Sequence, residues 1–195
     1  TGVSRGKWVA LWSAIKSMRR RDGSDDPPPP GRNPHVDFHG ERRTNDTHVA
    51  PHEPQAKLFR KGKSQGAKLY YMGHVLMEHR NGLPVEVQIT EATGCAEREA
   101  ALAMLKRHGA ATVAADKAYD TRDFVASCRQ LKITPQVAQN IARPGGSAID
   151  GRTTRHPGYL ASQRIRKRIE EMFGWGKDGR ALRKMRVRGL RNVTF

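Results

Sequence analysis

The chain has 195 residues, with 36 Lys or Arg against 19 Asp or Glu and a formal net charge of +17. This excess predicts a polyanionic partner, and nucleic acid fits better than a membrane surface because no long amphipathic helix with a bulky apolar face is evident. No apolar run has the length of a membrane span. The two cysteines, Cys95 and Cys128, lack the spacing of a disulfide framework or a zinc site.

The N-terminal third is predicted to contain one helix and a long polar segment. Trp8, Leu11, Trp12 and Ile15 recur at helical spacing, which predicts an amphipathic helix over about 7–21. The proline run that follows cannot continue a helix. We therefore expect three parts, which are an N-terminal remnant at 1–23, a Pro/Gly-rich polar insertion at 24–68 and an ordered core at 69–195.

The core alternates between predicted strands and helices, which is typical of an α/β layer architecture. Asn81-Gly82 is the preferred two-residue hairpin turn. Val85, Val87 and Ile89 alternate with polar residues, which predicts a half-buried return strand. The expected strands cover 69–79, 85–90, 112–115 and 133–138, and the expected helices cover 96–107, 121–131 and a final stretch from about 160 to 173 or beyond.

Two acids are candidates for a metal site. Asp116 closes the strand at 112–115, at the strand end where open α/β sheets place ligands. On the last helix Glu170 and Lys177 share a face with Arg166, at roughly 100° per residue. The adjoining face, expected to pack on the sheet, carries Ile165, Ile169, Met172 and Phe173. Facing carboxylates repel unless cations neutralise them, and oxygen ligands select Mg²⁺ or Mn²⁺. Ordinary roles stay open, as a cap for Asp116 and an ion-pair partner for Glu170.

The stretch Ala115-Asp116-Lys117-Ala118-Tyr119-Asp120 resembles the Asp-Lys-Gly-Tyr-Asp motif of bacterial insertion-sequence transposases of the DDE type. Asp116 matches the second catalytic acid of that family, and Arg166-x3-Glu170-x6-Lys177 matches the signature around the third. The resemblance covers roughly residues 12–193. It implies an RNase H-like fold, with a mixed sheet flanked by helices. It also implies metal-dependent DNA strand cleavage at transposon ends, followed by attack of the freed 3′-hydroxyl on target DNA.

The resemblance further implies cofactors, partners and a location. Two Mg²⁺ or Mn²⁺ ions would be held by Asp116 and Glu170 in an intact member. The partner would be double-stranded DNA, and self-association of the chain is compatible with the family. The segment 152–191 carries 13 Lys/Arg against 3 acids and supports phosphate binding. The expected location is the bacterial cytoplasm, at the nucleoid. The expected DNA contacts are Arg166, Lys177, Arg164 and Lys184.

Three departures from the family pattern bear on activity. Gln163 replaces the signature's Tyr, and Ala118 replaces a Gly. The first acid belongs in a strand about seven residues before Trp12, where this chain has Arg5, and an arginine cannot bind Mg²⁺. We therefore expect a truncated or degenerate copy with impaired catalysis. A non-catalytic DNA-binding remnant and a product that does not fold are the alternatives.

Overall fold

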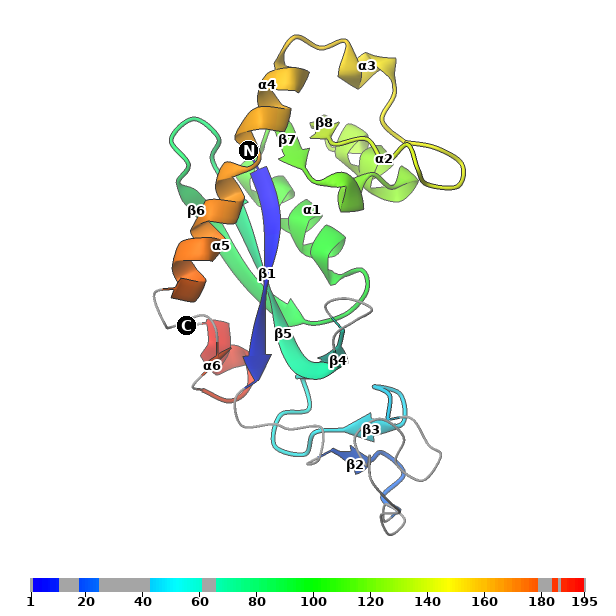
Figure 1. Cartoon of the computed structure of the whole chain (residues 1–195), viewed down its shortest axis with the longest axis vertical. Coiled ribbons are helices and arrows are strands. Elements are labelled where there is room, and N and C mark those ends of the chain that lie inside the picture. Colours follow the sequence, from blue (N-terminus) through cyan, green and yellow to red (C-terminus); the bar gives the residue numbers. More distant parts are fainter. Residues whose placement is uncertain are drawn as a thin grey trace. The chain divides into compact units, whose positions relative to one another are not determined.

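The structure is a computed structural model. It describes the backbone of residues 2–10, 18–24, 43–60, 66–178, 184–185 and 187–194. Side chains are described for residues 18–24, 43–60, 66–174 and 187–194. The chain divides into two compact units (Figure 1). The first unit comprises Thr1–Gly6, Gly73–Gln88 and Cys95–Gly179. The second comprises Lys7–Met72, Ile89–Gly94 and Arg180–Phe195.

The first unit is an α/β structure with parallel strands. In the strand order β5-β1-β7-β8, β1 pairs in parallel with β7 (Gly2 opposite Ala114) and β7 pairs in parallel with β8 (Thr112 opposite Thr134), while β6 pairs with β5. The strands are β1 (Gly2–Ala10), β5 (Lys68–Met77), β6 (Pro84–Glu91), β7 (Thr112–Ala115) and β8 (Thr134–Val137). The helices are α1 (Ala96–His108), η2 (Lys117–Tyr119), α2 (Arg122–Gln130), α3 (Gly151–Thr154), α4 (Gly158–Ile165) and α5 (Arg168–Asp178).

Helices cover both faces of β5 in the first unit. Leu76 belongs to a core cluster with Met104 and Leu105 of α1. Its neighbours Val75 and Met77 instead pack with residues of α5. Because successive side chains of a strand point to opposite faces, α1 and α5 lie on opposite sides of this strand. The same main cluster takes in buried side chains of β7, α2, β8 and α4.

The second unit has a smaller core of its own. β4 (Lys57–Phe59) pairs antiparallel with β5, and β9 (Lys184–Met185) pairs in parallel with β1, with Val9 opposite Lys184. β2 (Arg19–Arg20) pairs antiparallel with β3 (His48–Val49), and α6 (Leu190–Thr194) ends the described chain. The cluster of buried side chains in this unit consists of Met18, Ala50, Ala56, Leu69, Tyr71, Ile89 and Val193.

Several predicted elements are confirmed, with small shifts at their ends. The strands expected at 69–79, 112–115 and 133–138 are β5, β7 and β8, and the helix expected at 96–107 is α1. Gly109 ends α1 in the left-handed conformation at φ 57°, which a glycine adopts at little steric cost. The predicted apolar stripe of the last helix is confirmed on α5, where Ile169 and Phe173 are buried and Met172 packs against them, whereas Ile165 ends α4 and is outside this cluster.

Two helix predictions are wrong. Lys7 to Ala10 belong to strand β1 and not to an N-terminal helix, while residues 11–17 lie outside the described part of the chain. The final helix is interrupted at Arg166 and Lys167, so α4 and α5 are separate elements (Figure 1). Hydrogen bonds that span three residues, from Ile169 N to Arg166 O (3.4 Å) and from Glu170 N to Lys167 O (3.0 Å), mark the break. Past the break, α5 continues through Gly174 and Gly176.

The predicted hairpin differs in its turn and in its burial. The turn runs from Glu78 to Leu83, and the Glu78 carboxylate accepts bonds from the backbone N–H of Arg80 and of Asn81. In the return strand β6 the burial is the reverse of the prediction over most of the length, because the apolar side chains are exposed and the polar ones between them are partly buried. Val85 and Val87 are 44% and 51% exposed, whereas only Ile89 of the expected apolar set is buried.

The part of the predicted insertion that the structure describes is ordered. Residues 43–60 hold β3 and β4 together with buried Ala50 and Ala56. Residues 25–42, with the proline run, lie outside the described residues. The proposed boundaries at 24 and 69 stay predictions.

Candidate active site

Asp116 lies directly after β7, whose last three residues are buried. It is exposed, and its Oδ1 accepts a hydrogen bond of 2.7 Å from the backbone N–H of Ala118, so the side chain caps η2. Among the described atoms the other oxygen, Oδ2, has no hydrogen-bond partner. The capping role expected as the ordinary alternative is therefore real. It fixes the carboxylate while leaving one oxygen for a ligand.

Arg5 lies on the strand beside Asp116. β1 is parallel to β7, with Gly2 opposite Ala114. Arg5 is three residues past Gly2, and Asp116 is two residues past Ala114. In this register Ser4 is level with Asp116, and Arg5, in the middle of β1, lies one residue further along.

Glu170 lies in the first turn of α5 and is exposed. Its neighbour Ile169 is buried against Val75 and Met77, which fixes the helix to β5. The next residue, Glu171, is equally exposed, so burial does not distinguish the two acids. Neither Asp116 nor Glu170 forms an ion pair with any side chain that the structure describes, and both lie in the first unit.

Arg166 is half-buried at the junction of α4 and α5 and is tied to β8 through Gln163. The Arg166 Nε donates to Gln163 Oε1 at 3.1 Å, and Gln163 Nε2 donates to the carbonyl of Gln136 at 2.8 Å. Gln163 thus positions the guanidinium against the sheet. Arg164 is exposed on α4. Lys177 and Lys184 have described backbone in α5 and β9, and their side chains lie outside the description.

The described side chains include no group of three or more His, Cys, Asp or Glu that is able to hold a metal ion. If Arg5 stands where a third acid belongs, two carboxylates remain as candidate metal ligands. Their donors still fit Mg²⁺ in kind, because magnesium is commonly bound by one or two carboxylates together with substrate phosphates. Asp116 and Glu170 are the two candidates that the sequence motifs select for such an ion.

Asp120 is a residue whose role the sequence analysis missed. In the sequence it stands out only as the second acid of the motif and as a capping residue just before the helix expected at 121–131. It is completely buried, and its two carboxylate oxygens accept from the backbone N–H of Asn140 (2.6 Å) and of Ala148 (2.8 Å). Thr121 caps α2 instead, accepting from Phe124 N at 3.2 Å. The available signal was that two good capping residues stood side by side.

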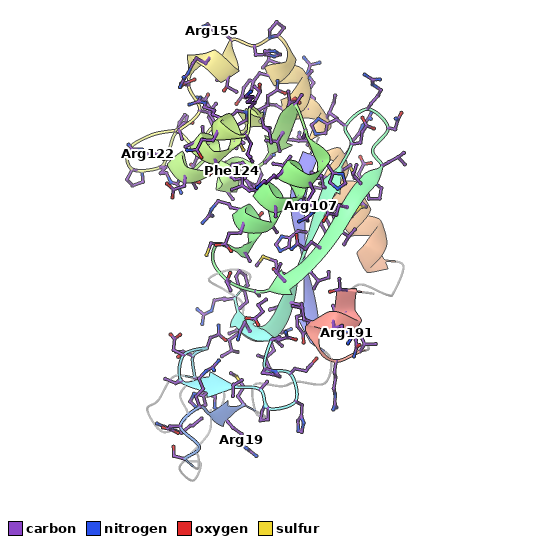
Figure 2. The ribbon with its side chains drawn as sticks, turned by 180° about the vertical axis from the view of Figure 1, so that it is seen from behind. Arg19, Arg107, Arg122, Phe124, Arg155 and Arg191 are labelled. Carbon is purple, nitrogen blue, oxygen red and sulfur yellow. The ribbon has the colours of Figure 1, made fainter. Side chains whose placement is uncertain are left out.

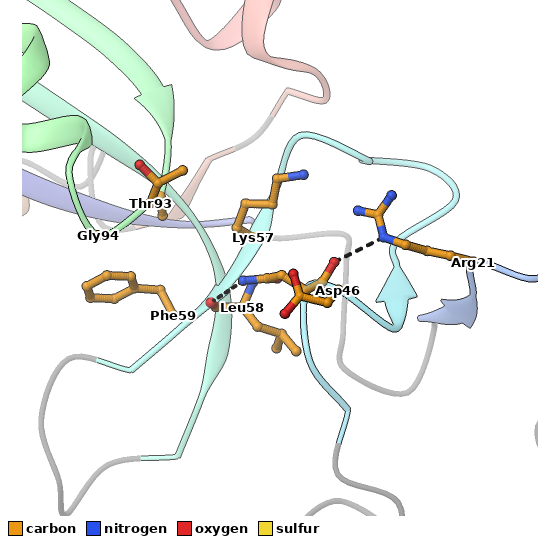
Figure 3. A pocket seen from close by; sticks show the side chains of 9 residues that line it. Arg21, Asp46, Lys57, Leu58, Phe59, Thr93 and Gly94 are labelled. Atoms are coloured by element: carbon orange, nitrogen blue, oxygen red, sulfur yellow. Dashed lines mark hydrogen bonds between the residues drawn. The ribbon is translucent and has the colours of Figure 1, made fainter.

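The second unit has an open hollow of about 700 Å³ (Figure 3). Its wall is braced by Asn45, whose side-chain amide accepts from Leu58 N at 2.7 Å and donates to Leu58 O at 3.0 Å. Arg21 donates to the Asn45 carbonyl at 3.0 Å. None of the predicted site residues lines it, and its remaining lining residues are Asp46, Lys57, Phe59, Ala92, Thr93 and Gly94.

Exposed arginines are spread over both units, as the labels in Figure 2 show. Asp150 neutralises part of this charge in the first unit, since its carboxylate lies 3.1 Å from Arg129 and 2.7 Å from Arg152. Hydrogen bonds from Arg152 lower the pKa of Asp150 to about 2. Arg122, Arg155 and Arg164 are exposed and form no ion pair with a described side chain.

An α/β unit with acids at its strand and helix ends, on a strongly basic chain, suits an enzyme or a binding protein that acts on nucleic acid. The chain matches the family model of the transposase DDE domain over residues 41–195, and it belongs to that family. The match contains Asp116 and Glu170 and begins after Arg5. Members of the family act on DNA in transposition and use divalent metal ions. No curated protein and no solved structure matches the chain. None of the described helices is long and apolar enough to cross a membrane.

Proposed function

We propose that the chain derives from an insertion-sequence transposase that cuts and joins DNA strands at transposon ends, on an RNase H-like fold. The observation that carries the proposal is the position of Asp116, exposed at the end of a buried strand that runs parallel to β1. The strand order, in which β1 lies between β5 and β7, supports the fold assignment. Double-stranded DNA is the proposed partner, in an assembly of several copies at the bacterial nucleoid.

Asp116 and Glu170 are the proposed ligands for Mg²⁺ or Mn²⁺, two ions in an intact member. Such ions stabilise the attacking and leaving oxygens of an in-line displacement at phosphorus. The chain's part is to hold the carboxylates in place, through the bond from Ala118 N to Asp116 and through the packing of Ile169 beneath Glu170. Both acids remain accessible to a bound phosphodiester.

Arg166, Arg164, Lys177 and Lys184 are the proposed DNA contacts. Arg166 is supported best, because Gln163 uses only one of its five donor N–H groups among the described bonds. The remaining donors suit a phosphate, for which the planar guanidinium is well shaped. A cation here would offset the charge of the DNA backbone beside the two acids.

Arg5 favours impaired catalysis in this copy. A guanidinium at the position of the first acid contributes a positive charge where the reaction needs a ligand oxygen, and it would oppose metal binding. The second candidate function, a DNA-binding remnant without cleavage activity, is favoured by the same residue and by the net charge of +17.

Cleavage of a supercoiled plasmid with Mn²⁺ or Mg²⁺ tests the proposal. We expect the unsubstituted chain to cut poorly, Arg5→Asp to restore nicking, and Arg5→Asp combined with Asp116→Ala to abolish it. A matched control is Arg5→Asp combined with Asp123→Ala, because Asp123 is also exposed but lies on α2. Nicking by the unsubstituted chain that is lost in Asp116→Ala would show that Arg5 does not impair the enzyme. DNA binding without nicking in every variant would favour the binding remnant.

A further inference from the structure

Residues 140–148 form a loop that the buried carboxylate of Asp120 closes. The loop follows β8, and its two ends donate to the two oxygens of Asp120 through Asn140 N and Ala148 N. A third bond ties the middle of the loop to the same residue, because the Arg143 guanidinium donates to the Asp120 carbonyl. Gln139 Nε2 also donates to the Ile149 carbonyl at 2.9 Å. The loop therefore has a fixed shape although its tip is in solvent.

The tip of this loop carries an unusual set of side chains. Residues 141–146 are all exposed, and Ile141, at 80%, is the most exposed of the large apolar side chains that the structure describes. There is no acidic residue between Gln139 and Ile149. A large apolar side chain held in water on a braced loop gains nothing for the fold. Loops positioned by a rigid scaffold are where binding residues are commonly found, and Ile141 stands on such a loop beside Arg143.

Arg122 adds a second cation to the same surface. Its Nη2 lies 3.8 Å from the Cβ position that a side chain at Gly145 would occupy, and Figure 2 shows it beside the loop. Gly145 and Gly146 have φ of 83° and 72°, so the loop depends on glycine here. Arg122 is also the first residue of α2. A cation is unfavourable at a helix N-terminus and a bound anion is favourable there.

We infer that the 140–148 loop is a DNA-contact element, in which Arg122 and Arg143 bind phosphates, Ile141 packs against exposed bases or sugars, and Asp120 is the positioning residue that holds the loop in shape. The inference rests on the proposed function, since it assigns part of the DNA surface of the same unit. Phosphate contacts of arginine position a protein on DNA, and apolar side chains are used at unstacked base steps. The loop supplies both kinds of group on one rigid element.

Binding of a fluorescein-labelled DNA duplex, followed by anisotropy over a range of salt concentrations in EDTA, tests the inference with the full chain. Each lost phosphate contact lowers the slope of log K against log salt by about 0.9. We expect that change in Arg143→Gln and in Arg122→Gln. Lys132→Gln, which removes an exposed cation elsewhere in the first unit, should leave the slope unchanged.

The apolar contact has a different signature. Ile141→Ser should weaken binding about five-fold at every salt concentration, the effect of losing about 40 Å² of apolar contact, with no change of slope. Leu83→Ser is the control, because Leu83 is 61% exposed and lies outside the loop. If the Ile141 and Arg143 variants bind as their controls do, the loop makes no contact and the inference fails while the proposed function stands. Absence of DNA binding by the unsubstituted chain would overturn both.

For Asp120, the direction of the change in DNA binding tests the positioning role. Replacing a carboxylate by a neutral amide removes negative charge, which by electrostatics alone would strengthen DNA binding. We expect Asp120→Asn to weaken binding and lower the salt slope, because asparagine cannot accept from both ends of the loop. Unchanged or stronger binding would overturn the positioning role. Thermal unfolding checks that the variant is folded, and the Ile141 and Arg143 variants decide the matter if it is not.

Discussion

Asp116 and Asp120 belong to the same short motif, but they have different surroundings and therefore different roles. Asp116 is exposed and uses one oxygen to cap η2. Asp120 is buried, and both of its oxygens accept backbone N–H groups of a distant loop. A buried acceptor left without its donors costs about 1–3 kcal/mol. The role of Asp120 is therefore explained by folding, and Asp116 is available for a ligand.

His79 predicts a loss of stability in mild acid. Burial lowers the pKa of His79 to about 4, and its Nε2 has no hydrogen-bond partner among the described atoms. The unfolded chain has a histidine pKa of about 6.5. Between these values the unfolded state binds a proton that the folded state does not, so stability falls as the pH drops through this window.

Urea unfolding of the parent and of His79→Gln, at several values between about pH 7 and about pH 4, measures this contribution. We expect the parent to lose more stability than the variant over that range. His52→Gln, which changes an exposed histidine, is the control and should follow the parent. Parallel curves for parent and His79→Gln would show that His79 has an ordinary pKa.

At the scale of elements, β6 shows how a partner helix selects the face of a strand. Glu86 pairs with Arg107 and, at 2.8 Å, with the Nε2 of His108, and both partners lie in the last turn of α1. The hydrogen bond from Arg107 lowers the pKa of Glu86. The polar side of the strand therefore faces the helix, and Val85 and Val87 face solvent.

Because β6 is inverted, replacing an apolar residue of this strand by threonine should change the free energy of unfolding by different amounts at different positions. Val85→Thr and Val87→Thr should alter the free energy of unfolding by less than about 0.5 kcal/mol, because surface substitutions have small effects. Ile89→Thr should cost about 2 kcal/mol, since Ile89 is buried in the core of the second unit. Denaturant unfolding of the three variants provides the comparison. A cost of about 2 kcal/mol at Val85 would mean that this face is covered.

At the scale of the whole molecule, the two units are interleaved along the chain. The strands β1, β5 and β6 each begin in one unit and end in the other. The first unit needs Leu76 for its main cluster, and α5 needs Val75 and Met77. Each unit is built from three separate segments of the sequence.

A fragment of residues 95–179 should therefore fail to fold alone. It contains most of the first unit but lacks β1, β5 and β6, so α1 would lose its contact with Leu76 and the apolar residues of α5 would lose Val75 and Met77. Thermal unfolding followed by circular dichroism should show no cooperative transition for the fragment and one for the full chain. A sharp transition in the fragment would mean that its helices form a core without the strands.

Local patterns in the sequence were sufficient for elements marked by a clear apolar run or a turn residue. The helix α1, with Gly109 after it, and the strands β5, β7 and β8 follow from periodicity and turn residues. The strand β1 does not, because its partners are distant in sequence, with Gly2 opposite Ala114 and Val9 opposite Lys184. The helical spacing of Trp8 with the apolar residues after it was outweighed, within β1, by pairing that no local window contains.

The candidate site divides in the same way. Asp116 and Glu170 could be selected from motifs, and their close approach stays a prediction. The burial of Asp120 and the link from Arg166 through Gln163 to β8 depend on contacts across about 20 or more residues. Such contacts leave no periodic trace in the sequence.

The break at Arg166 and Lys167 has a consequence for how this segment tolerates change in length. α4 is held by Tyr159, whose hydroxyl donates to the Val137 carbonyl at 3.1 Å, and α5 is held separately by Ile169 and Phe173. Since each helix has its own anchor, a residue inserted at the junction leaves both anchors seated and is absorbed by the turn. The same insertion inside α5 would rotate everything beyond it by about 100° and carry Lys177 off the face of Glu170. Length variation in this region is therefore tolerable at the junction and damaging a single turn later.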